Sequence, residues 1–135
     1  MSHPALELQK AVFAALSADA GLVARLGGAY IYDPVPASQA FPYVSFGKAT
    51  MRDWSTASEA GSEHRIVLDV WSKAKGRAEA LRIMDDIRAC LDQVLPPLAD
   101  HVLVSLAFEA SELGFDDDLA LYHGSIRYRA LIETA

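Results

Sequence analysis

Residues 63–73, EHRIVLDVWSK, are the clearest strand in this sequence and decide how the rest of the chain is interpreted. A strand places successive side chains on opposite faces of a sheet. One face of this segment is fit for a core and holds His64, Ile66, Leu68 and Val70. The other face mixes charge with large apolar groups, as a surface covered by a neighbour would, and holds Glu63, Arg65, Val67, Asp69 and Trp71.

Patterns elsewhere in the chain predict further helices and strands. Residues 74–95 place apolar side chains at helical spacing, and Pro96 and Pro97 stop that segment. The stretch 29–42 is rich in proline, so we expect it to be irregular. Gly114–Asp118 carries the signals of a hairpin turn. The predicted helices are 4–16, 19–26 and 74–95, and the predicted strands are 43–51, 63–73, 102–112 and 119–133.

This order of elements predicts an α+β fold. We expect an antiparallel or mixed sheet of about four strands, flanked by two main helices. In the first helix, the polar side chains of Glu7, Gln9 and Lys10 are expected to face away from the core. A length of 135 residues fits a single domain over 1–135.

Charge and cysteine content restrict the partners of the chain. Its formal net charge is -6, from 18 acidic and 12 basic residues. Tight nucleic-acid binding needs a basic face, so it is disfavoured, although DNA can pass an acidic surface without sticking. The single cysteine, Cys90, permits no intrachain disulfide and fits a reducing interior such as a bacterial cytoplasm. No apolar run approaches the length of a membrane span, so we expect no membrane partner.

No pattern in the sequence predicts catalysis or metal binding. No serine lies in a Gly-x-Ser-x-Gly elbow, and Cys90 falls within the apolar stripe of the predicted helix 74–95, where a core role is expected. The four histidines lack metal-ligand spacing. We therefore expect no catalytic residue, cofactor or metal.

An acidic run in the predicted hairpin turn suggests two interpretations. It consists of Asp116, Asp117 and Asp118, and it lacks the spaced ligands and closing Glu of a calcium loop. We expect a solvated hairpin tip. In a functional variant of this interpretation, the tip points at a partner or at a central channel.

Two further features are candidate partner-binding surfaces. Trp54 follows Asp53 in a polar loop, Arg52–Ser62, where a large aromatic side chain either folds back or anchors an interface. The charged face of the 63–73 strand is the second candidate, and its alternative is cross-strand ion pairing on a solvated face. That second candidate comprises Glu63, Arg65, Asp69, Arg127 and Arg129.

A series of short segments extends through most of the chain. They are FPYV (41–44), DWST (53–56), GSEH (61–64), VWS (70–72), GRAEA (76–80), LVSL (103–106), HG (123–124) and RYRAL (127–131). In this order and in a chain of this size, they resemble the tail terminator, or tail-completion, family of long-tailed phages, prophages and gene transfer agents. The resemblance spans roughly Leu6 to Glu133.

The resemblance implies a structural role without catalysis. Members of this family have a small α+β fold and assemble with themselves into a ring, usually a hexamer, that caps the finished tail tube. The implied partners are the major tail tube protein and the head-side connector or stopper protein, with DNA passing through the ring without sequence-specific binding. The implied location is the bacterial host cytoplasm during assembly and then the head–tail junction of the particle.

Two alternatives to the terminator function remain at this stage. One is another connector or stopper component of the same particle, and the other is a small ligand-binding protein or enzyme with a dispersed site. For the terminator, ring closure requires two different complementary surfaces on each subunit. We expect one surface to involve the loop Arg52–Ser62 and the other to be the exposed sheet face.

Overall fold

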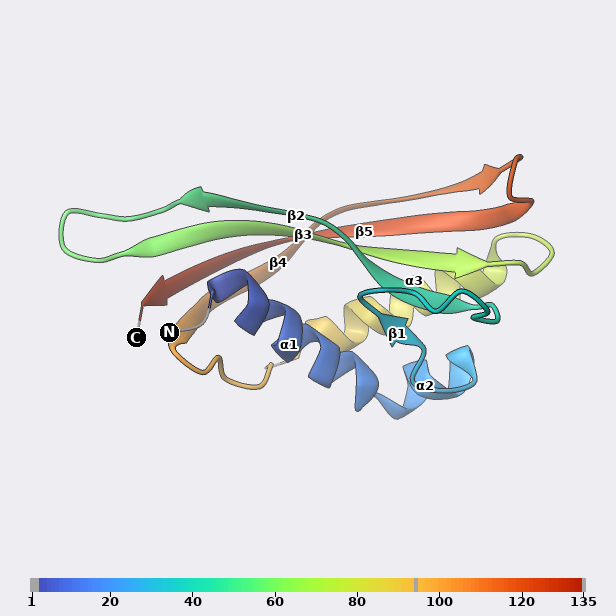
Figure 1. The fold of residues 1–135 in the computed structure, drawn as a ribbon, viewed down its shortest axis with the longest axis horizontal. Helices are drawn as coiled ribbons and strands as arrows, with labels where there is room; N and C mark the ends of the chain where they lie inside the picture. Colours follow the sequence, from blue (N-terminus) through green and yellow to red (C-terminus); the bar gives the residue numbers. More distant parts are fainter. Residues whose placement is uncertain (1–2, 94, 135) are drawn as a thin grey trace.

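The computed structural model describes residues 3–93 and 95–134. Within these residues, three helices lie on one face of a five-stranded sheet (Figure 1). The helices are α1 (Pro4–Ser17), α2 (Ala20–Leu26) and α3 (Ala78–Leu91), and the strands are β1 (Ile31–Tyr32), β2 (Tyr43–Asp53), β3 (Gly61–Ser72), β4 (His101–Asp116) and β5 (Leu121–Thr134).

The sheet is mixed, in the order β1-β2-β3-β5-β4. β1 pairs with β2 in parallel, and the remaining pairs are antiparallel. The predicted α+β class is therefore confirmed, with one more strand than expected. β1 has only two residues and lies in the stretch predicted to be irregular, where so short a strand leaves no periodic pattern.

Local signals fix the ends of α1 and α2. Pro4 occupies the first turn of α1, where a missing N–H costs nothing, and His3 Nδ1 accepts a hydrogen bond from the backbone N–H of Ala5. Asp19 caps α2 by accepting from the N–H of Leu22 at 2.9 Å. Gly27, with φ of 85°, ends α2 in the left-handed conformation that glycine adopts without strain.

The structure corrects the predicted limits of the major helix. α3 begins at Ala78, four residues after the predicted start, because Gly76 adopts a left-handed φ of 82° that a helix cannot contain. It ends at Leu91, before the proline pair that disfavours helical geometry in the preceding residue. The predicted span also includes Val94, which lies outside the described residues.

Both hairpins are longer than the sequence predicts. β2 continues to Asp53 and β3 starts at Gly61, so the expected loop 52–62 shortens to residues 54–60. β4 continues to Asp116, and its turn to β5 occupies residues 117–120. Figure 1 shows the β2–β3 hairpin extending beyond the helices at one end of the sheet, and the β4–β5 hairpin at the opposite end.

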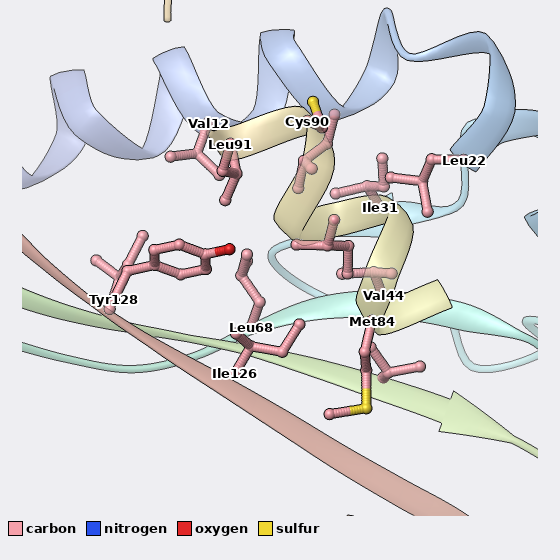
Figure 2. Close-up of a cluster of buried hydrophobic side chains, with 14 of the residues drawn as sticks. Val12, Leu22, Ile31, Val44, Leu68, Met84, Cys90, Leu91, Ile126 and Tyr128 are labelled. Carbon is pink, nitrogen blue, oxygen red and sulfur yellow. The ribbon is translucent and has the colours of Figure 1, made fainter. Parts of the chain in front are cut away.

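The hydrophobic core lies between the helices and the inner face of the sheet. The predicted inward face of β3 is confirmed, since His64, Leu68 and Val70 are all buried. Figure 2 shows side chains from α1 and α3, including Val12 and Leu91, converging on the side chains of the sheet. Full burial of one such aliphatic side chain stabilises the fold by about 1.5–3 kcal/mol.

Replacing Leu68 by Ala should lower the free energy of unfolding by about 2–5 kcal/mol, because the fully buried side chain leaves a cavity in the centre of the core. Leu81→Ala is the matched control, since Leu81 is 47% exposed, and it should change the free energy by less than about 0.5 kcal/mol. Urea unfolding measures both. Equal effects of the two variants would contradict this account of the core.

Candidate partner surfaces

A network of ion pairs covers part of the outer face of the sheet, which is the face turned away from the helices. Arg65 lies at its centre: its Nη1 is 2.7 Å from Glu63 Oε1, and its Nε is 3.0 Å from Glu109 Oε1. Arg129 Nη2 lies 2.6 Å from Glu63 Oε2, and Arg127 Nε lies 3.3 Å from Glu109 Oε1. The structure therefore brings together four of the candidate partner-binding residues.

Sequence analysis did not identify Glu109, although it accepts hydrogen bonds from Arg65 Nε and Nη2. The register between β4 and β5 shifts between Phe108 and Ala110, so a bulge at Glu109 adds one residue to β4. A bulge breaks the alternation of faces, and simple alternation then gives the wrong face for part of the strand. Only the shifted register could have revealed this residue.

The ion pairs keep the network charged at neutral pH. The hydrogen bond from Arg129 holds the pKa of Glu63 below its ordinary value, and the hydrogen bond from Arg65 does the same for the pKa of Glu109. In return, Glu109 raises the pKa of Arg65. In the isolated chain, these charges are therefore satisfied by cross-strand partners.

Asp69 belongs to a different group on the outer face. Its Oδ1 lies 2.7 Å from Nε2 of His123, and the His123 ring stacks on Trp71 with centroids 4.1 Å apart. The indole Nε1 of Trp71 donates to Ser45 Oγ at 2.9 Å. This packing holds the Trp71 ring against the sheet, and it separates Asp69 from the arginine network.

Trp54 is partly folded back and partly exposed. Its backbone N–H donates to the carbonyl oxygen of Gly61 at 2.9 Å, and a Cβ on Gly61 would lie 3.0 Å from Trp54 Cε3. The side chain nevertheless keeps 37% of its surface exposed. Asp53 accepts a hydrogen bond from Ser55 Oγ at 2.7 Å, so its carboxylate also has a local role in ordering the loop.

The acidic run lies at the tip of the β4–β5 hairpin. Asp116 Oδ1 accepts from the N–H of Leu119 at 2.9 Å and orders the turn, while Asp117 and Asp118 are exposed. Two apolar side chains, Phe115 and Leu119, are also exposed there. In the part of the chain that the structure describes, no group of three or more His, Cys, Asp or Glu side chains is placed to hold a metal ion.

A buried contact between a carboxylate and a histidine joins α1 to the start of β4. Glu7 Oε2 lies 2.7 Å from His101 Nδ1, and Glu7 Oε1 accepts from the N–H of Asp100 at 2.7 Å. Burial raises the pKa of Glu7, but these hydrogen bonds outweigh it and the net shift is downward. The expectation that Glu7 faces away from the core is wrong, because only 5% of the residue is exposed and its partners lie far along the chain.

Cys90 is a core residue, as the sequence predicts. Its side chain is buried, and Sγ donates to the carbonyl oxygen of Ala15 at 3.3 Å. Burial raises the pKa of its thiol to about 11, so the reactive thiolate is scarce at neutral pH. Among the described helices, none combines the length and the hydrophobicity that a membrane span requires.

Replacing Glu63 by Gln should weaken the acid sensitivity of the fold. The folded pKa of Glu63 is below the ordinary value of 4.5, so this carboxylate stabilises the fold above that value and loses its effect as pH falls through the folded pKa. The free energy of unfolding should therefore fall more steeply in the wild type than in Glu63→Gln below about pH 4.5.

Urea unfolding at a series of pH values measures this difference. Glu59→Gln is the control, because Glu59 takes no part in the ion pairs of the described residues, and it should keep the wild-type slope. The same slope in Glu63→Gln would remove this carboxylate from the acid response.

Comparisons with known proteins agree with this fold. The family described as tail completion protein gp17 matches residues 10–133. A chain from the virion of a native gene transfer agent particle is 32% identical, with a TM-score of 0.88, over 98% of this chain and 99% of that chain. The bacteriophage SPP1 gp17 protein shares the fold, with a TM-score of 0.57 and 23% identity over 96% of this chain and 89% of that chain.

No match was found among curated proteins. The family match covers the segments on which the resemblance was based, from the FPYV segment at 41–44 to RYRAL at 127–131, and it includes most of α1 and nearly all of β5. The resemblance predicted from the sequence is thus confirmed, and the chain belongs to the tail completion protein gp17 family of phage and gene-transfer-agent tail components.

Proposed function

We propose that the chain is a non-enzymatic tail terminator that works as a single domain. Copies of it form a hexameric ring on the finished tail tube, end polymerisation of the tube protein and join the tube to the head-side connector. The observation that carries this proposal is the end-to-end similarity to a chain of a gene-transfer-agent virion, which covers nearly all of both chains. A likeness over both full lengths supports the same kind of role in a particle.

The charge of the chain supports a passive path for DNA through the ring. A net charge of -6 opposes retention of phosphates, and the arginines of the outer sheet face are already paired with Glu63 and Glu109. DNA would therefore cross the ring without sequence-specific contacts. Asp117 and Asp118, exposed at the β4–β5 tip, would face the channel or a partner protein.

We further propose that the outer sheet face and the Trp54 loop contact neighbouring proteins in the particle. Trp54 and Asp53 belong to a hairpin that extends beyond the helices, where a partner can reach them without unfolding the core (Figure 1). A charged surface on the outer face would orient a neighbouring protein more than it would raise the affinity of the contact. This surface consists of Glu63, Arg65, Asp69, Arg127 and Arg129.

The length of tails made without this chain tests the proposed function. In electron micrographs, particles from a strain lacking the gene should show overlong or ragged tubes that fail to join heads. Tails of normal length joined to heads would contradict the proposal. Tails of normal length left unjoined would overturn it in favour of a connector.

Trp54→Ala should weaken ring assembly on tubes while leaving the monomer folded. An aromatic anchor at an interface contributes about 2 kcal/mol or more when it is a hot spot. Trp54 lies outside the buried core cluster, so its loss should leave the monomer folded. Co-sedimentation with purified tubes measures assembly, and circular dichroism measures folding. Unchanged assembly would exclude Trp54 from the interface.

A further inference from the structure

Large apolar side chains remain exposed along two opposite sides of the molecule. On one side, Leu6 of α1 lines a small cavity with Phe46 and Ala49 of β2. On the other, Arg88 of α3 covers the ring of Phe108 in β4, and Leu81 lies two turns earlier on the same helix face. We name these sides the β2 flank, with Leu6, Phe13 and Met51, and the β4 flank, with Leu81, Val102 and Val104.

Each flank includes one open edge of the sheet: β2 for the β2 flank and β4 for the β4 flank. Both edges carry an exposed apolar side chain at the same position along the strands. In the residues that the structure describes, β4 pairs with β5 alone, and β2 beyond Ser45 pairs with β3 alone. The registers give one row across the sheet, Arg52–Glu63–Leu131–Ser105. Met51 and Val104 therefore lie next to this row at opposite edges, and they are 52% and 47% exposed.

The flanks also differ in charge. Lys48 and Arg52 of β2 are exposed and make no ion pair within the described residues. The β4 flank presents Asp85 and Asp92 on the helix face of Leu81, likewise exposed and outside those ion pairs. Arg88 lies between these two aspartates but is held over an aromatic ring. A basic strand edge and an acidic helix face of the same chain are complementary.

We propose that the β2 flank of one copy packs against the β4 flank of the next copy in the ring. The inference rests on the proposed function and names the surfaces that build its ring. Beside Val104, a groove of about 480 Å³ lined by Leu91, Leu95 and Val102 would receive Met51. Because the two flanks differ, the contact is heterologous, and such a contact closes a ring when the rotation between neighbours divides a full turn.

Contact through side chains fits these edges better than a continuous hydrogen-bonded sheet. β2 carries a register shift between Phe46 and Ala49, and β4 carries shifts at Leu103/Ser105 and Phe108/Ala110. Such bulges interrupt the ladder of backbone groups and discourage strand pairing between copies. The exposed side chains next to them remain available, so the neighbour is selected by apolar fit and charge.

Thiol cross-linking in assembled particles tests this interface. The variant Met51→Cys/Val104→Cys replaces the wild-type gene, and purified particles are treated with a short bifunctional maleimide. Denaturing gels should show a ladder of species spaced by 14.6 kDa, whose largest member counts the subunits of the ring. The buried Cys90 should not react, so wild-type particles and each single variant should show no ladder.

Met51→Cys/Leu119→Cys is the matched control. Leu119 is 55% exposed, but it lies at the opposite end of the β4 edge, in the β4–β5 tip. Tails of normal length that give no ladder with Met51→Cys/Val104→Cys, or an equal ladder with the control pair, would overturn the inference and leave the terminator function standing. Loss of the terminator function itself is detected separately, in the strain lacking the gene.

A charge reversal keeps the inference falsifiable if the cysteine variant fails to assemble. Arg52→Glu should reduce the number of head-joined particles by about tenfold or more, because it places like charges across the contact. Adding Asp92→Arg to Arg52→Glu should recover most of the head-joined particles that were lost. Wild-type numbers with Arg52→Glu, or no rescue by the second change, would contradict the pairing of these flanks.

Discussion

The pleat of β3 is the constraint on which the rest of the structure depends. β3 is the central strand, and its inward residues Leu68 and Val70 are fully buried beneath the helices. Because alternate residues must then point outward, Arg65, Asp69 and Trp71 are placed on the outer face. A slip of one residue would expose the core side chains and bury this charge, so the core fixes the outer surface as firmly as it fixes the interior.

That outer surface is largely self-satisfied. Arg65 and Arg129 neutralise Glu63, Arg127 and Arg65 neutralise Glu109, and His123 engages Asp69. Charges that are already paired within the chain contribute to the orientation of a neighbouring protein more than to the affinity of the contact. Most of the large apolar side chains left exposed lie instead on the outer sides of α1 and α3, at the sheet edges and at the hairpin ends. A small chain built around one sheet thus leaves two unlike sides, which is the requirement for a closed ring.

Sequence alone predicted the parts of the fold that have a local physical signal. The two-residue period of 63–73 predicted both faces of β3, and the predicted helix 19–26 matches α2 at Ala20–Leu26. Prediction failed where the cause was distant or irregular. The buried partner of Glu7 is His101, 94 residues away, and the bulge at Glu109 breaks the alternation on which the strand prediction relied. The contacts proposed for Trp54 and Asp116–Asp118 depend on partner molecules, whose surfaces this sequence does not encode.

A cryo-electron microscopy reconstruction of the head–tail junction is the most direct measurement of the central claim. The account predicts a closed ring of this chain between the last layer of the tail tube and the head-side connector, with an open channel along its axis. Neighbouring copies should touch with β2 beside β4. A junction that lacks this chain, or one in which its copies do not touch one another, would contradict the account.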